Sequence, residues 1–379
     1  MRTPRQTLAL KPRIVPADEC LRPTRAEVDL GALAHNLRTV RSVLGKTRIL
    51  AVVKADAYGH GVVPVAARLE TEGVDGFGVA LAEEALELRE AGIAAPILVL
   101  NGVYGGAHRA VIAAGISPVV YDLHDVEAFH RASFGRPVGV HLKIDTGMAR
   151  LGVPVGELDA FLDSMGRFGR VRIEGVMTHL AAAGTDEEVT QQQLTAFRRA
   201  LWRIRGRGHR PHHVHAANSA GMLHEDARFD MVRPGLALFG LAEGLSGLEP
   251  VLRLRTELIA VRTVEARAPI GYDAAFRAPR RMNVATVPMG YGDGLLRASG
   301  AGGVMLVHGK RCPIVGRVSM DLTTIDVTDV PQARVGDEAV VLGEQGDERL
   351  TATELARVAG TVSYEVLTNV SRRVPRFYR

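Results

Sequence analysis

The feature that most restricts the fold of this chain is a series of eight short apolar runs between residues 48 and 238. The runs cover residues 48–54, 76–80, 97–101, 117–121, 139–144, 173–179, 213–218 and 231–238. Most of them are separated by helix-like amphipathic segments, such as 81–91 and 187–205. They do not alternate strictly with polar residues, which is typical of parallel strands buried on both faces. Strands and helices in alternation predict a (β/α)8 barrel of the TIM type.

The pattern changes near residue 253, where short valine-rich runs begin and glycine–aspartate turns separate them. This change predicts a mostly-β domain over residues 253–379, following a barrel domain over residues 21–252. Two domains are also the expected number for a chain of 379 residues. Residues 1–20 are basic and punctuated by proline, and we expect them to form a loosely ordered N-terminal extension.

Charge and cysteine content argue against several classes of protein. The formal net charge is +5, but the basic residues are scattered and form no patch with aromatic residues, so no nucleic-acid partner is expected. No apolar stretch reaches the length of a membrane span or resembles the core of a signal peptide, so we expect a cytoplasmic protein without a membrane partner. Cys20 and Cys312 provide neither a disulfide framework nor a metal-ligand spacing, so no metal site is expected.

Lys54 closes the first apolar run and is one of only five lysines in the chain. A lysine at a buried strand end is costly unless its charge is paired or neutralised. An imine with an aldehyde cofactor would neutralise it, and arginine, which supplies nearly all the other positive charge, cannot form one. An ion pair with Asp56 is the alternative, and the spacing of the residues leaves both interpretations open.

Polar residues also follow the other predicted strands, at the end of the barrel where active sites lie. They are Lys143, Arg150, His179, His215, Asn218, Ser219 and Arg233. The loops after the seventh and eighth strands are a recurrent phosphate site in such barrels, and Ser219, Gly235 and Leu236 can contribute a hydroxyl and backbone N–H groups there. No glycine-rich motif for a dinucleotide or a nucleoside triphosphate is present.

Several longer motifs resemble those of the alanine racemase family. They cover residues 53–61 (VKADAYGHG), 143–152 (KIDTGMARLG), 215–220 (HAANSA), 232–235 (VRPG), 290–294 (GYGDG), 318–321 (VSMD) and 363–366 (SYEV). The motifs occur in the family's order, and the resemblance extends from about residue 22 to residue 378. It implies pyridoxal 5′-phosphate as the cofactor, a free amino acid as the substrate, and a homodimer in which the second domain completes the partner's active site.

The resemblance also implies individual roles. Lys54 would hold the cofactor as an internal aldimine, and Arg150 would contact its phenolic oxygen. Lys143 is expected to carry a carbamate that orients Arg150, while His179 would lie near the pyridine ring. The phosphate would be held by Tyr58, Ser219, Gly235, Leu236 and Tyr364, with Asn218 in the same cofactor-binding set. The resemblance also places Met320 among the expected catalytic residues.

Arg233 would face the pyridine nitrogen of the cofactor. Arginine does not give up its proton, so the nitrogen facing it should stay unprotonated. A carboxylate at this position would instead keep the nitrogen protonated and make the ring a strong electron sink. The arginine therefore favours simple proton exchange at Cα over other reactions of a long-lived carbanion.

The sequence departs from the family at the second catalytic base, a tyrosine four residues after another tyrosine. Residues 271–278 read GYDAAFRA, so Phe276 occupies the position of the tyrosine. Phenylalanine has no ionisable group, and loss of a positioned acid–base group typically costs about 10²–10⁴-fold in rate.

Three hypotheses follow from this departure. The first is racemisation of an alanine-type amino acid, with water, Tyr272, Asp273 or Tyr291 acting on the second face of Cα. The second is one-base chemistry on a D-amino acid, such as transamination or aldol cleavage. The third is a catalytically weak protein that binds pyridoxal phosphate. A single-barrel cofactor carrier is a further alternative, against which the second domain argues.

Overall fold

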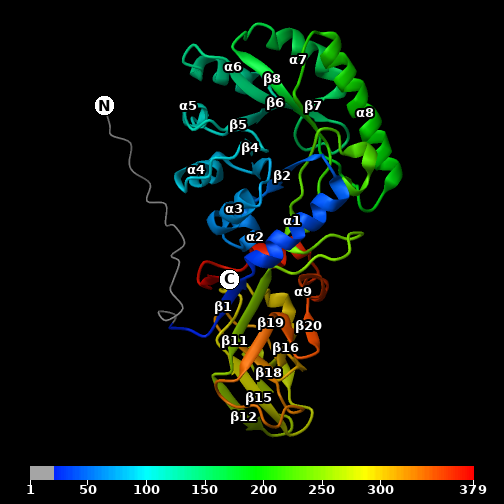
Figure 1. Cartoon of the computed structure of the whole chain (residues 1–379). Coiled ribbons are helices and arrows are strands. Elements are labelled where there is room, and N and C mark those ends of the chain that lie inside the picture. The colour runs from blue at the N-terminus through cyan, green and yellow to red at the C-terminus, as the bar shows by residue number, and fades with distance from the viewer. Residues whose placement is uncertain (1–20) are drawn as a thin grey trace. The chain divides into compact units, whose positions relative to one another are not determined.

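The computed structural model describes residues 21–379, and the predicted N-terminal extension, residues 1–20, lies outside the described residues (Figure 1). The chain divides into two compact units. The first comprises residues 30–251, and the second comprises residues 252–379 together with the segment before residue 30. Among residues 21–379, no helix combines the length and the apolar character needed to cross a bilayer.

The first unit is built on eight parallel strands, as the sequence predicted. They are β2 (Arg48–Val52), β3 (Gly76–Val79), β4 (Ile97–Val99), β5 (Ser117–Val120), β6 (Val138–Asp145), β8 (Val171–Met177), β9 (His213–His215) and β10 (Met231–Val232). They pair in the order β10-β2-β3-β4-β5-β6-β8-β9, and a short strand, β7 (Val153–Pro154), adds to β6. A hydrogen bond of 3.0 Å from Arg233 N to Ala217 O joins the segments after β10 and β9, so the barrel is nearly closed.

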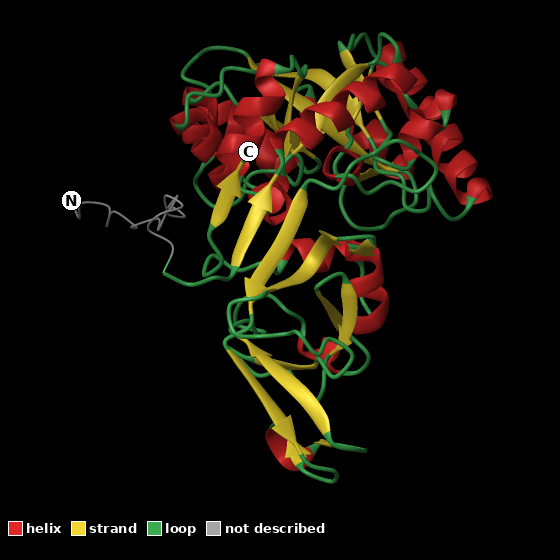
Figure 2. Ribbon diagram, turned by 60° about the horizontal axis from the view of Figure 1, so that its bottom comes forward, coloured by secondary structure: helices red, strands yellow, loops and turns green. Residues whose placement is uncertain are grey.

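Helices surround these strands (Figure 2). They are α1 (Leu30–Leu44), α2 (Lys54–Gly59), α3 (Val62–Thr71), α4 (Ala82–Glu90), α5 (His108–Ala113), α6 (Leu123–Ala132), α7 (Leu158–Met165) and α8 (Glu187–Gly206). The longest of them, α8, begins where the side chain of Asp186 accepts a hydrogen bond from Val189 N. Its buried face includes Leu194, Phe197 and Leu201 at helical spacing, which fixes the helix against the barrel.

The interior of the barrel is filled by apolar side chains from different strands. Leu50, Leu98, Val119, Met177 and Met231 form a buried cluster. This filled core gives the ends of the strands a rigid support, as in other barrels of this type.

The second unit is mostly β, which confirms the predicted fold of this region. Its strands are β1 (Arg25–Val28), β11 (Leu252–Glu257), β12 (Ala260–Val264), β13 (Pro269–Ile270), β14 (Phe276–Arg277), β15 (Met282–Val287), β16 (Val304–Val307), β17 (Lys310–Pro313), β18 (Thr323–Asp326), β19 (Glu338–Gln345), β20 (Glu348–Leu350) and β21 (Arg376–Tyr378). Its two α-helices are α9 (Ala352–Ala359) and α10 (Ser363–Thr368). The main sheet has the order β17-β16-β19-β11-β1-β21.

Strand β1 corrects the predicted start of the barrel at residue 21. It pairs antiparallel with β11 and parallel with β21, so the segment belongs to the second unit. Its side chains alternate between buried and partly exposed, which suits a sheet with one covered face. Glu27 accepts hydrogen bonds from Arg255 at 2.6 Å and Arg253 at 3.2 Å, which ties β1 to β11.

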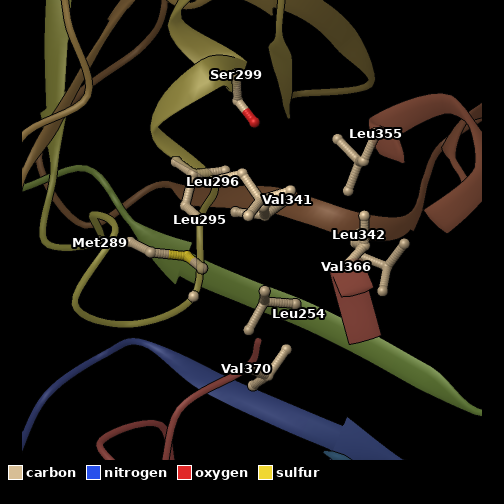
Figure 3. Close-up of a pocket in the computed structure, with 11 residues that line it drawn as sticks. Leu254, Met289, Leu295, Leu296, Ser299, Val341, Leu342, Leu355, Val366 and Val370 are labelled. Carbon is tan, nitrogen blue, oxygen red and sulfur yellow. The ribbon is translucent and has the colours of Figure 1, made fainter. Parts of the chain in front are cut away.

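A small apolar cavity lies within the second unit (Figure 3). Its lining comes from the main sheet, α9, α10 and the segment around Leu295, and Ser299 contributes the one side-chain hydroxyl. No titratable side chain lines it. The cavity is therefore part of the hydrophobic core and offers no group for catalysis.

Candidate functional site

Lys54 is the first residue of α2, two positions after the end of β2. The four residues that follow it, Ala55 to Tyr58, all have left-handed backbone angles, with φ between 52° and 54°. This conformation costs roughly 1–2 kcal/mol per residue for amino acids other than glycine. Such strain persists only where the surrounding structure imposes it, and it is concentrated at functional sites.

Glu84, on α4, is the main external support of this left-handed turn. Its carboxylate accepts hydrogen bonds from Ala55 N at 2.6 Å and from Ala80 N at 2.7 Å and Leu81 N at 3.1 Å. One side chain therefore joins the residue after Lys54 to the loop after β3. Sequence reasoning missed Glu84, although an acidic residue in the first turn of a predicted helix is a recognisable capping signal.

Asp56, the alternative partner considered for Lys54, also supports the turn. Its carboxylate accepts a hydrogen bond from Val62 N at 2.7 Å, at the start of α3. Burial, and then the charge of Arg150, lower the pKa of the Lys54 amine, whereas Glu84 acts in the opposite direction. A lowered pKa increases the fraction of neutral amine, which is the form that attacks an aldehyde and accepts a proton.

Lys143 adds a second buried amine to the same end of the barrel. Its side chain is only 4% exposed, and Nζ donates to Leu100 O at 3.5 Å. Burial lowers its pKa to about 8, and the charges of Arg233, Arg150 and Lys54 act in the same direction. At Lys143, Asp145 is the acidic group that opposes these three positive charges. Such a concentration of positive charge favours the binding of an anion.

Asp145 builds the loop that leads from β6 to Arg150. Its Oδ1 accepts hydrogen bonds from Gly147 N and Met148 N at 3.0 Å and from Ala149 N at 3.1 Å. A Cβ atom at Gly152 would lie 2.5 Å from Asp145 N, so the return of the chain past β6 requires glycine. These contacts place Arg150 at an exposed position after the loop.

Arg233 is buried and donates only to neutral groups. Its Nη1 donates to His215 Nδ1 at 2.8 Å, and its Nη2 donates to Thr178 O at 2.7 Å and to Ala216 O at 2.8 Å. His179 Nδ1 lies 3.4 Å from Nη2. Burial lowers the pKa of Arg233 to about 9, so the guanidinium remains protonated at neutral pH.

The guanidinium also fixes the proton positions of two histidines behind it. Arg233 can only donate, so His215 Nδ1 must be the acceptor. Burial holds the pKa of His215 well below its usual value, and the neutral ring then carries its proton on Nε2 and donates it to His141 Nδ1 at 2.8 Å. Burial likewise lowers the pKa of His179 to about 3. His141 was not singled out from the sequence, because a lone histidine within a strand gives no signal.

A group of donors suited to a phosphate lies at the loops after β9 and β10. Ser219 Oγ accepts from Gly235 N at 2.9 Å and from Ala237 N at 3.4 Å, beside a short 3-10 helix, η5 (Leu236–Phe239). A Cβ atom at Gly235 would collide with the Tyr58 hydroxyl, so glycine allows this hydroxyl to approach the backbone. Hydroxyl and backbone N–H groups from these loops thus converge, and with Lys54 they fit a phosphorylated aldehyde.

Asn218, predicted to bind the cofactor, instead supports the loop after β9 in this structure. Its Oδ1 accepts from Gly221 N at 2.8 Å, and its Nδ2 donates to Leu180 O at 3.5 Å. Both bonds hold the backbone beside Ser219. Any contact of Asn218 with the cofactor stays a prediction.

Three predicted site residues belong to the second unit: Phe276, Met320 and Tyr364. The ring of Phe276 is partly buried and packs against a cluster that includes Ile270 and Val315. Met320 and Tyr364 are exposed, and partial burial of the Tyr364 hydroxyl raises its pKa.

Comparisons with known proteins agree with this geometry over nearly the whole chain. Residues 28–243 match the family model described as alanine racemase, N-terminal domain, and residues 251–378 match alanine racemase, C-terminal domain. The alanine racemase of Sorangium cellulosum is 49% identical over 95% of this chain and 100% of that protein. That of Symbiobacterium thermophilum is 44% identical over 94% of this chain and 97% of that protein.

Solved structures give the same result. The crystal structure of alanine racemase from Bacillus anthracis with bound L-Ala-P has a TM-score of 0.90 and 36% identity, covering 96% of each chain. Alanine racemase from D-cycloserine-producing Streptomyces lavendulae also has a TM-score of 0.90, with 34% identity over 95% of this chain and 98% of that chain.

Proposed function

Because this chain belongs to the alanine racemase family, we propose that it interconverts L- and D-alanine with pyridoxal phosphate bound to Lys54. The observation that carries the proposal is the arrangement of Lys54 itself. An amine of lowered pKa stands before a strained turn, at the same end of the barrel as the other cations and the donors around Ser219. A generic phosphate-binding barrel has no need of such an amine.

Each of these groups has a task in this reaction. When bound, pyridoxal phosphate would withdraw electrons from Cα of the amino acid and make the α-proton more acidic. Lys54 in its neutral form would accept that proton on one face of Cα, and the ammonium so formed would return it. Arg233 stays protonated. With the cofactor bound, it would face the pyridine nitrogen and leave it without a proton, and Arg150 would bind the phenolic oxygen. Tyr58, Ser219, Gly235, Leu236 and Tyr364 would hold the cofactor's phosphate.

The second face of Cα requires a group other than Phe276. Of the three side chains considered, Asp273 forms an ion pair with Arg317 at 2.6 Å, so its carboxylate already has a charged partner. The rings of Tyr272 and Tyr291 are exposed on the second unit. We therefore assign the second proton transfer to a tyrosine hydroxyl or to a water molecule held by one.

We also propose that the protein is a cytoplasmic homodimer. The second unit carries several large exposed side chains near its predicted site residues, namely Tyr272, Tyr291, Met320, Leu322 and Tyr364. A subunit interface is the usual place for such a group of apolar and aromatic side chains. The buried thiol of Cys312 suits a reducing compartment.

The decisive experiment is exchange of the α-proton in D₂O, with added pyridoxal phosphate and with L- and D-alanine in separate reactions. Proton NMR follows loss of the α-proton, and a chiral assay follows inversion. We expect exchange and inversion from both isomers. Exchange from D-alanine alone, without inversion, would refute racemisation and support one-base chemistry.

Lys54→Ala tests the cofactor attachment in the same preparation. We expect this variant to lose both the exchange and the visible absorption band of the attached cofactor, because no other amine can replace Lys54 before the left-handed turn. Lys46→Ala is the matched control, since Lys46 is exposed after α1. A band that persists in Lys54→Ala would mean that another lysine holds the cofactor.

A further inference from the structure

Gln193, on α8, is a buried polar residue that the reaction described above does not use. Its side chain is only 2% exposed, which is uncommon for glutamine. Both ends of its amide have partners. Oε1 accepts from Ala181 N at 2.8 Å, and Nε2 donates to His179 O at 3.1 Å and to the Thr146 hydroxyl at 3.3 Å.

These partners lie in two different loops of the site. Thr146 belongs to the loop after β6, four residues before Arg150, whereas His179 and Ala181 follow β8. The two loops also touch directly, because the hydroxyls of Thr146 and Thr178 are 2.7 Å apart. Gln193 therefore holds the loop that carries Arg150 against the loop that carries His179.

The same contacts reach the guanidinium of Arg233. Thr178 O accepts a hydrogen bond of 2.7 Å from Arg233 Nη2, and Thr178 precedes the residue whose carbonyl Gln193 binds. A shift of the backbone at residues 178–181 would move both the His179 ring and an acceptor of Arg233. Two groups expected at the pyridine ring thus depend on one glutamine.

The support behind Gln193 is rigid. Helix α8 is anchored on the barrel by Leu194, Phe197 and Leu201, while Ala149, Arg150 and Ala181 in the two loops are exposed. Exposed loops are mobile unless they are tied to such an element. An amide suits this task because it donates at one end and accepts at the other, whereas an ionised carboxylate can only accept.

We propose that Gln193 is a positioning residue that sets the relative placement of the loops after β6 and β8, and thereby the affinity of the site for pyridoxal phosphate. The proposal rests on the proposed function, because it assumes that Arg150, His179 and Arg233 contact the cofactor. It adds a residue of the outer helix layer to the determinants of cofactor binding.

The test is the dissociation constant of pyridoxal phosphate, measured by absorbance titration of the cofactor-free protein, together with visible circular dichroism of the bound cofactor. Gln193→Met keeps the length of the side chain and removes every hydrogen bond, so we expect the dissociation constant to rise about tenfold or more. The circular dichroism of the cofactor should change as well. Gln193→Glu keeps the acceptor and loses the donor. Its dissociation constant for pyridoxal phosphate should therefore lie between those of the wild type and Gln193→Met.

Two controls separate positioning from a general loss of stability. Thr190 is buried one turn earlier on α8 and donates to Asp186 O at 2.8 Å, so Thr190→Val removes a hydrogen bond that lies within the helix region. Gln192 is exposed on the same helix, so Gln192→Met makes the same replacement at a position outside the buried contacts of Gln193. We expect both controls to bind pyridoxal phosphate within about twofold of the wild type, whatever their melting temperatures.

The outcomes distinguish the two proposals. If Gln193→Met melts at a lower temperature but binds the cofactor with unchanged affinity and circular dichroism, Gln193 is only structural and the inference is wrong. If Gln193→Met does not fold, Gln193→Glu is judged by the same criterion. A wild-type protein that binds no pyridoxal phosphate would refute the proposed function and this inference together, whereas a cofactor-binding wild type isolates the role of Gln193.

Discussion

At the scale of single residues, Phe276 marks the point where the sequence departs from the family's pattern. Its ring packs against the cluster around Ile270 and Val315, and it starts the short strand β14. The segment before it is held by the ion pair between Asp273 and Arg317. The position is therefore well ordered by its own unit, and what it lacks for acid–base catalysis is a hydroxyl group.

Phe276→Tyr should raise the racemisation turnover. A positioned acid or base contributes about 10²–10⁴-fold, so we expect a gain of about a hundredfold if the hydroxyl reaches the second face of Cα. The measurement is kcat for both isomers, with Phe276→Leu as the control that alters the ring without adding a hydroxyl. Unchanged turnover in Phe276→Tyr would show that the geometry on the second face of Cα has diverged by more than this one residue.

At the scale of elements, the left-handed turn of α2 is the most unusual local structure. Glycine suits positive φ, and Gly59 and Gly61 adopt it, but Ala55 to Tyr58 do so as well. Glu84 supports this conformation from α4, and Asp56, within the turn itself, ties it to the start of α3. The strain is thus the cost of placing Lys54 and Tyr58 on the same short segment.

Alanine-to-glycine substitutions at two exposed positions should have opposite effects. Ala55→Gly relieves left-handed strain, and after allowance for the more flexible unfolded chain we expect the free energy of unfolding to rise by about 0.5–1 kcal/mol. Ala67→Gly, in the regular helix α3, should lower it by about 1 kcal/mol. Urea denaturation of the cofactor-free protein measures both changes. A loss of stability in Ala55→Gly would show that the turn is not strained.

At the scale of the whole molecule, the chain does not divide at a single point. Strand β1 lies between β11 and β21 in the main sheet of the second unit, although the barrel follows it directly in the sequence. The chain therefore leaves the second unit at residue 29 and returns to it at residue 252. Each unit has its own core, and Ala26 and Val28 belong to that of the second.

Ala26→Asp should destabilise the second unit selectively, because it places an unpaired charge at a fully buried position of β1. Hydrogen exchange followed by mass spectrometry should show faster exchange in β11 and β21. The barrel strands β2 and β3 should keep their protection, and the same substitution at exposed Ala67 is the control. Faster exchange in the barrel strands alone would contradict the assignment of β1.

The sequence by itself determined the features that repeat or that form a continuous motif. Eight apolar runs predicted the eight strands of the barrel, because a strand that is buried on both faces consists almost entirely of apolar residues. Lys54, and the loops with Arg150 and Ser219, were found because each lies at the end of such a run. Seven of the eight predicted runs were too long at their carboxyl ends, whereas β6 extends one residue beyond its run, to Asp145. The eighth run was drawn to residue 238, but β10 ends at Val232 and the chain forms η5 after Gly235.

Only the tertiary structure decided which distant side chains hold these residues in place. Glu84 binds a backbone amide 29 residues away, and Gln193 binds a hydroxyl 47 residues away. A single hydrogen bond of this kind creates no periodicity and needs no particular neighbour in the sequence, so composition and spacing do not reveal it. The placement of β1 was also decided by the tertiary structure. A strand of only four residues does not show in its own sequence which sheet it will join.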